Sequence, residues 1–243
     1  MGKFGKWIGG GLGWAFGGPI GAILGYAIGS MFDGASDGPY LHAGQTRGNT
    51  RSGDFGISLL ILAGEVMKAD GKVLKSELDY IKTFFVQQFG VDDTKEKMQL
   101  FKSILKQDVD IREVCYQIKA NMGLHARLQL VHFLFGISKA DGHVHSTEVN
   151  VISNIANYLG ISSNDFESIK AMFYKDANAA YKILEINESV KDDEVKKAYR
   201  KMAIKYHPDK ISHLGDEFQQ AAKEKFQKVN EAYETIKKER GIN

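Results

Sequence analysis

From about residue 55 onward, apolar side chains recur every three or four residues, which is the spacing of a buried stripe along an α-helix. Within the second of these apolar segments, Ser76 is a suitable N-cap and Gly90 a suitable end. Alternation typical of strands is hard to find, and the chain has only three prolines. We therefore predict an all-α fold for the soluble part. The predicted helices cover residues 56–69, 76–90, 93–107, 110–123, 124–140, 146–160 and 162–175.

Two of the predicted helical pairs are joined by the same motif. Lys-Ala-Asp-Gly-x-Val-x-x-x-Glu occurs at residues 68–77 and again at residues 139–148. Asp-Gly favours a tight turn, and a new helix would follow, capped by Ser76 in the first copy and by Ser146 or Thr147 in the second. The duplication predicts two pseudo-symmetric helical pairs packed around one core.

The start of the chain has a different pattern. Residues 7–32 carry no charge, and glycine recurs at every fourth position. At ~1.5 Å per residue, this run is long enough to cross a bilayer as one helix. The glycines would share one face and let a second helix approach closely, which predicts a homodimer within membrane lipid. These residues are Gly9, Gly13, Gly17, Gly21, Gly25 and Gly29.

Two other interpretations of this run stay open. Lys3 and Lys6 before an apolar stretch are also typical of a cleaved signal peptide. The step Gly17-Gly18-Pro19 would allow a short hairpin in place of a straight span. Cations flank the run on both sides, so the positive-inside rule barely decides its orientation.

Composition narrows the function classes. Residues 33–53 are rich in Gly, Ser, Thr, Asn and Asp, which predicts a flexible linker. The net charge is +2, and this near-neutral balance disfavours a nucleic-acid partner. Cys115 is the single cysteine and lies in an apolar pattern, so we expect a buried, inert thiol and a reducing compartment.

The most informative stretch begins at Tyr181 and predicts three helices, of which the second and third form an antiparallel pair. Pro208 would end the second helix near His207. The apolar face of the second helix is Val195, Ala198, Tyr199, Met202, Ala203 and Tyr206, and its other face carries Lys196, Lys197, Arg200, Lys201 and Lys205. The third helix presents Phe226, Val229, Ala232, Tyr233 and Ile236.

These features resemble the J-domain of DnaJ-type co-chaperones over residues 178 to about 238. The resemblance implies that the chain binds the ATP state of a DnaK-type chaperone and stimulates the partner's ATP hydrolysis, without being an enzyme itself. It also implies which residues bind the chaperone: His207, Pro208, Asp209, Lys196, Lys197, Arg200, Lys201, Lys205 and Lys210. The Gly/Phe-rich region and the Cys-x-x-Cys repeats of full DnaJ proteins are absent, so client binding through them is not expected.

The duplicated unit resembles the TerB-like domains named after tellurite-resistance proteins, over about residues 55–174. This resemblance suggests that Asp70, Glu77, Asp141 and Glu148 could converge on a divalent cation, with two histidines nearby. In the alternative, each Asp shapes its turn and each Glu lies in the first turn of the next helix, where the helix dipole favours it. If the cation site is real, the chain could instead be a metal- or stress-responsive membrane adaptor.

The first residues also resemble the membrane anchor of DjlA-type co-chaperones, and the order of parts is the same. We predict an anchor at 1–32, a linker at 33–53, a TerB-like domain at 54–175 and a J-domain at 178–243. The resemblance implies a single-pass protein of the bacterial inner membrane whose J-domain faces the cytoplasm. A third hypothesis is a glycine-zipper assembly whose main product is oligomerisation.

Overall fold

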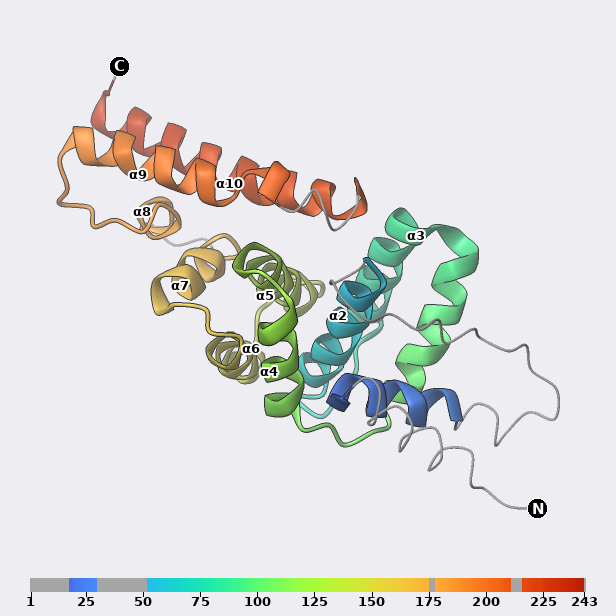
Figure 1. Cartoon of the computed structure of the whole chain (residues 1–243). Helices are drawn as coiled ribbons and strands as arrows, with labels where there is room; N and C mark the ends of the chain where they lie inside the picture. The colour runs from blue at the N-terminus through green and yellow to red at the C-terminus, as the bar shows by residue number, and fades with distance from the viewer. Residues whose placement is uncertain (1–17, 30–51, 175–177, 211–215, 243) are drawn as a thin grey trace, which may run out of the picture. The chain divides into compact units, whose positions relative to one another are not determined.

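The computed structural model describes residues 18–29, 52–174, 178–210 and 216–242. Every regular element in this part of the chain is helical, which confirms the all-α prediction (Figure 1). Gly9, Gly13 and Gly17 lie outside the described residues, as does the predicted linker up to residue 51. The chain forms two compact units, Met1–Met122 and Gly123–Asn243, and the division falls inside the segment predicted as one TerB-like domain.

The first unit is built around α2 (Ser52–Met67), which packs against α3 (Lys75–Ile104) and α4 (Ile111–Asn121) (Figure 1). Much of α2 is buried, because its sequence is almost uniformly apolar. Cys115 is buried on α4, and burial raises its pKa to about 12. The prediction of a buried thiol is therefore confirmed, and the raised pKa keeps the sulfur protonated and unreactive.

Residue Gly90 interrupts α3, as its sequence position predicts. It has φ 79° and ψ 174°, and two helical segments meet there. A positive φ of this size is a conformation that glycine adopts without steric cost. The predicted N-cap was wrong, because the N-cap is Leu74 rather than Ser76. A Glu77 oxygen accepts a hydrogen bond from the Leu74 N–H at 2.7 Å, so a side chain inside the helix satisfies the backbone at its start.

A short helix over residues 18–29 also belongs to the first unit (blue in Figure 1). It begins at the Gly18-Pro19 step, where Gly18 has φ 61° and proline suits the first helical turn. The Ile20 N–H donates to Gln117 Oε1 at 2.9 Å, and Gln107 Nε2 donates to the Ile23 carbonyl at 3.3 Å. Among the described residues, no helix has the combined length and apolar character that a membrane crossing requires.

The second unit contains three helices that complete the TerB-like segment. They are α5 (Leu124–Ser138), α6 (Ser146–Tyr158) and α7 (Ser163–Ala171), and α5 contacts both of the others. Along its second half α5 is buried nearly all round. Phe135 anchors it in the core, because its ring stacks on Phe173 and lies 5.6 Å from the ring of Phe166.

The rest of the second unit is a helical hairpin with a short third helix. It consists of α8 (Ala179–Ile183), α9 (Asp192–Lys205) and α10 (Asp216–Arg240), and α10 contacts both α8 and α9 (Figure 1). The predicted apolar faces meet: Val195, Met202 and Val229 are fully buried. Tyr199 stacks on Tyr233 with a centroid distance of 4.2 Å, and its hydroxyl bonds Asn230. The predicted helical pair is therefore confirmed.

Candidate functional site

The candidate site is the turn that follows α9. The helix ends at Lys205, and Tyr206 is its C-cap, in agreement with the stop predicted from Pro208. Residues 208–210 form one 3₁₀ turn, closed by a hydrogen bond of 3.0 Å from the Lys210 N–H to the His207 carbonyl. Proline fixes its own φ within this turn, so the turn holds the side chains on either side at defined positions.

His207 and Asp209 support each other within the turn. His207 Nδ1 accepts a hydrogen bond of 3.3 Å from the Asp209 N–H and lies 3.5 Å from Asp209 Oδ2. The imidazole makes a T-shaped contact with the ring of Phe226 of α10, with a centroid distance of 5.8 Å. The Asp209 carboxylate is 87% exposed. An exposed carboxylate on a braced turn can form a charge-assisted pair with a cation of another protein.

Beside the turn, α9 presents the predicted basic face. Lys197, Arg200 and Lys201 are exposed, as is Lys210 in the turn, whereas Lys196 is partly covered. The same face carries Ile204, which is 64% exposed and which the sequence analysis did not single out. Its signal was present in the sequence, because it falls between the basic positions and outside the apolar stripe. An apolar residue among cations is typical of a surface that binds a partner.

Lys205 differs from the other cations of α9. Its ammonium pairs with Glu185 at 2.6 Å and also with Asp165 of α7, and the side chain is only 18% exposed. Burial tends to lower the pKa of Lys205, but the hydrogen bonds and charges of Asp165 and Glu185 outweigh burial and raise it. Lys205 is therefore charged and already bound within the molecule.

Glu185 owes its position to the end of α8. The Ile186 N–H bonds the Tyr181 carbonyl and the Glu185 N–H bonds the Lys182 carbonyl, which is the Schellman pattern. Glu185 takes the left-handed position of this motif, with φ 56°, where glycine is the usual residue. Its carboxylate is buried and contacts both Lys201 and Lys205. The ion pairs explain why a strained glutamate occupies this position.

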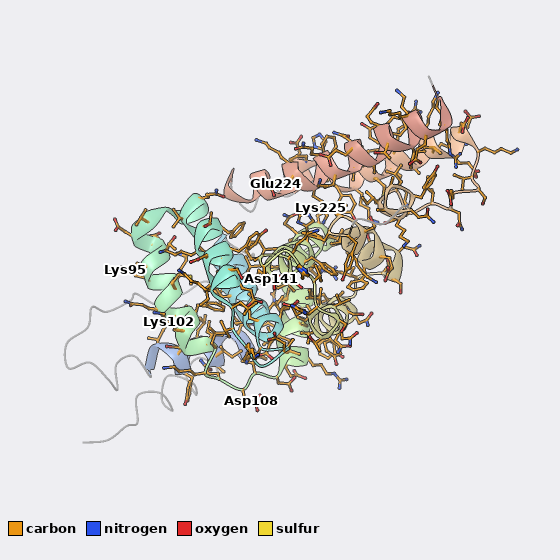
Figure 2. All side chains as sticks on the ribbon, turned by 180° about the vertical axis from the view of Figure 1, so that it is seen from behind. Lys95, Lys102, Asp108, Asp141, Glu224 and Lys225 are labelled. Atoms are coloured by element: carbon orange, nitrogen blue, oxygen red, sulfur yellow. The ribbon has the colours of Figure 1, made fainter. Side chains whose placement is uncertain are left out.

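Two buried charged residues near the turn were not predicted from the sequence. Ser162 caps α7 by accepting from the Asp165 N–H, and its hydroxyl donates to Asp165 Oδ2 at 2.7 Å. Lys225 of α10 (labelled in Figure 2) is 2% exposed, lies 4.3 Å from the Tyr206 ring centroid and donates to the Leu128 carbonyl of α5 at 3.1 Å. Burial, to which the charge of Lys205 adds, lowers the pKa of Lys225 well below its ordinary value, although Asp165 opposes this shift.

The four acidic candidates for a cation site have local partners. Asp70 and Asp141 each accept a hydrogen bond from the backbone N–H two residues later, at 2.9 and 2.8 Å. Glu77 and Glu148 are buried, and each accepts from the backbone N–H three residues earlier. Glu148 also accepts from Ser138 Oγ at 2.7 Å. These contacts match the local alternative.

In the second copy of the duplicated motif the predicted cap was also wrong, because the N-cap of α6 is His145 rather than Ser146 or Thr147. Gly71 and Gly142 have φ of 79° and 94°, so both copies use glycine for the same left-handed turn. In the described part of the chain, no group of three or more His, Cys, Asp or Glu side chains is placed to hold a metal ion. Cation binding by the four acidic residues stays a prediction.

Comparison with known families divides the chain into three matched parts. A family model described as "DnaJ domain" matches residues 179–241, which include the turn and all of α9. A model described as "Tellurite resistance protein TerB" matches residues 57–171. A third, described as "Co-chaperone DjlA transmembrane domain", matches residues 1–47.

Whole-length comparison agrees with these matches. The chain is 31% identical to the co-chaperone protein DjlA of Vibrio vulnificus, over 88% of this chain and 90% of that protein. It is 30% identical to its counterpart in Vibrio cholerae, over 79% and 80% of the two chains. The protein from Haemophilus influenzae is 28% identical over 98% of both. No solved structure matches the chain.

Proposed function

Because the chain belongs to the family of DjlA co-chaperones, we propose that it binds a DnaK-type chaperone and stimulates the chaperone's ATP hydrolysis. The observation that carries this proposal is the His207–Asp209 turn, which is exposed and braced at the end of a basic helix. The chain contributes no chemistry to the reaction. It changes the conformational equilibrium of a partner that performs the hydrolysis.

The exposed cations of α9 and the turn have separate roles in this proposal. Lys197, Arg200 and Lys201 attract an acidic surface of the chaperone and fix its orientation, an effect that acts mainly on the association rate and falls with added salt. Ile204 adds apolar contact area among them. Asp209 then pairs with a cation of the chaperone and favours the conformation that hydrolyses ATP.

A single-turnover ATPase assay with a DnaK-type chaperone tests this function. We expect His207→Gln to abolish the stimulation, because the variant loses the aromatic nitrogen that accepts from the Asp209 N–H. A matched control is Lys238→Gln, at the far end of α10, which should stimulate like the wild type. Full stimulation by the His207 variant, with an unchanged circular dichroism spectrum, would contradict the proposed mechanism.

The match of residues 1–47 to a transmembrane domain supports attachment to the bacterial inner membrane. We propose that residues 7–32 cross the lipid once, with residues 20 and 23 released from Gln117 and Gln107, that the J-domain faces the cytoplasm and that the glycine-spaced face pairs two copies. Cysteines placed at residue 3 and, separately, at residue 45 should react with a membrane-impermeant maleimide from opposite sides. Labelling from the same side would instead indicate a hairpin.

A further inference from the structure

At its end next to the turn, α9 contacts a residue from outside the J-domain. Asp165 lies on α7, within the TerB-like segment, yet it pairs with Lys205 and lies 3.5 Å from the Tyr206 hydroxyl. These are the two residues immediately before His207. One of the residues expected to bind the chaperone, Lys205, is therefore already bound within the same chain.

The other helix of the hairpin is held by the same part of the molecule. Lys225 Nζ donates to the Leu128 carbonyl of α5 and lies 4.3 Å from the Tyr206 ring centroid. A lysine with 2% exposure would cost free energy if it were left without an acceptor. Contacts from both α9 and α10 therefore dock the J-domain on α5 and α7.

In the proposed function, chaperone binding uses the Lys205 ammonium, which the docking on α7 already holds. Glu185 belongs to the J-domain and can follow Lys205, but Asp165 cannot. If Lys205 turned to an acidic partner, the Asp165 carboxylate, whose side chain is 8% exposed, would lose its ion pair. Breaking one half of a buried pair is costly, because the other charge stays desolvated.

We propose that α5 and α7 form an intramolecular docking surface for the J-domain, and that Asp165 withholds Lys205 from the chaperone until this surface is released. The proposal rests on the proposed function and adds a restraint to it. In the docked state the turn and the row Lys197, Arg200 and Lys201 are exposed, so the first encounter can occur. Full binding of the chaperone requires the J-domain to leave α5 and α7. Because only undocked molecules bind fully, docking lowers the apparent affinity for the chaperone.

The test is an isosteric substitution in the full-length protein. Asp165→Asn removes the charge that holds Lys205 and should lower the co-chaperone concentration that gives half-maximal stimulation, by about fivefold. The matched control is Ser162→Ala, which weakens the cap of α7 but leaves the Asp165 carboxylate facing Lys205. An Asp165 variant with the wild-type or a higher half-maximal concentration would overturn the proposal, as would an equal decrease in both variants.

Two further measurements keep the outcome clear. Hydrogen exchange of the α7 and α9 amides should be faster in Asp165→Asn than in Ser162→Ala, whether or not a chaperone is present, and equal rates would count against docking through this residue. If the wild type fails to stimulate any DnaK-type ATPase, the proposed function fails, whereas the exchange experiment still tests the docking. Should Asp165→Asn not fold, Asp165→Ser removes the same charge and keeps a short polar side chain.

Discussion

The duplicated Asp-Gly turns and the His-Pro-Asp turn both place a carboxylate beside the end of a helix, but they use it in opposite ways. In the duplicated turns, Glu77 and Glu148 are buried and accept backbone hydrogen bonds. In the other turn, Asp209 is 87% exposed. Carboxylates beside a helix end can therefore be buried as backbone acceptors or stay exposed, and burial in the fold separates the two cases.

The largest effect that we expect from this comparison is on stability. Glu148→Gln replaces a buried acceptor of two hydrogen bonds, from Ser138 Oγ and the His145 N–H, and places an NH₂ group at the same site. Unfolding by urea should show a loss of about 1–3 kcal/mol, while chaperone stimulation by the folded fraction stays unchanged. If stability is unaffected but added Ca²⁺ or Mn²⁺ no longer binds, the residue is a ligand and the comparison is wrong.

A smaller effect on stability tests the same comparison between an exposed and a buried residue, here with two lysines. Lys201 is 68% exposed, whereas Lys225 is buried with a lowered pKa. The unfolded chain holds the Lys225 proton up to pH ~10.4, so below that value and above the lowered pKa it binds more protons than the folded chain. The free energy of unfolding should therefore rise with pH across this window.

Two matched variants isolate the pH dependence of the unfolding free energy that comes from Lys225. Lys225→Met removes the titrating group, and the difference in unfolding free energy between wild type and variant should increase from pH 7.5 to pH 9.5. The same difference for Lys201→Met, whose side chain is 68% exposed, is the control, and the slope for Lys225→Met should exceed it. Since Cys115 is present in all three proteins, its own titration cancels. Two flat differences would show that Lys225 is not buried in solution.

Local signals made much of the fold predictable from the sequence. Helical spacing gave the segments of the body, Pro208 gave the end of α9, and the buried Cys115 followed from its apolar neighbours. The N-caps Leu74 and His145 were missed, because Glu77 and Glu148 satisfy the backbone there and the nearby serines do not.

The site was only partly predictable for a different reason. The exposed turn and basic row could be found because their residues are close in sequence. The pairs Asp165–Lys205 and Lys225–Leu128 join residues that lie 40 or more positions apart, and no local pattern marks them. Whether a lysine faces solvent or a carbonyl group is decided by tertiary packing, which helical spacing alone does not specify.

The central claim is that the exposed carboxylate acts on the partner and the buried one acts on the fold. The most direct measurement is to compare Asp209→Asn and Glu148→Gln in parallel, by single-turnover ATPase with a DnaK-type chaperone and by urea unfolding. We predict that Asp209→Asn loses stimulation with an unfolding free energy within about 0.5 kcal/mol of wild type, and that Glu148→Gln does the reverse. Retained stimulation by Asp209→Asn, or its loss in fully folded Glu148→Gln, would contradict the account.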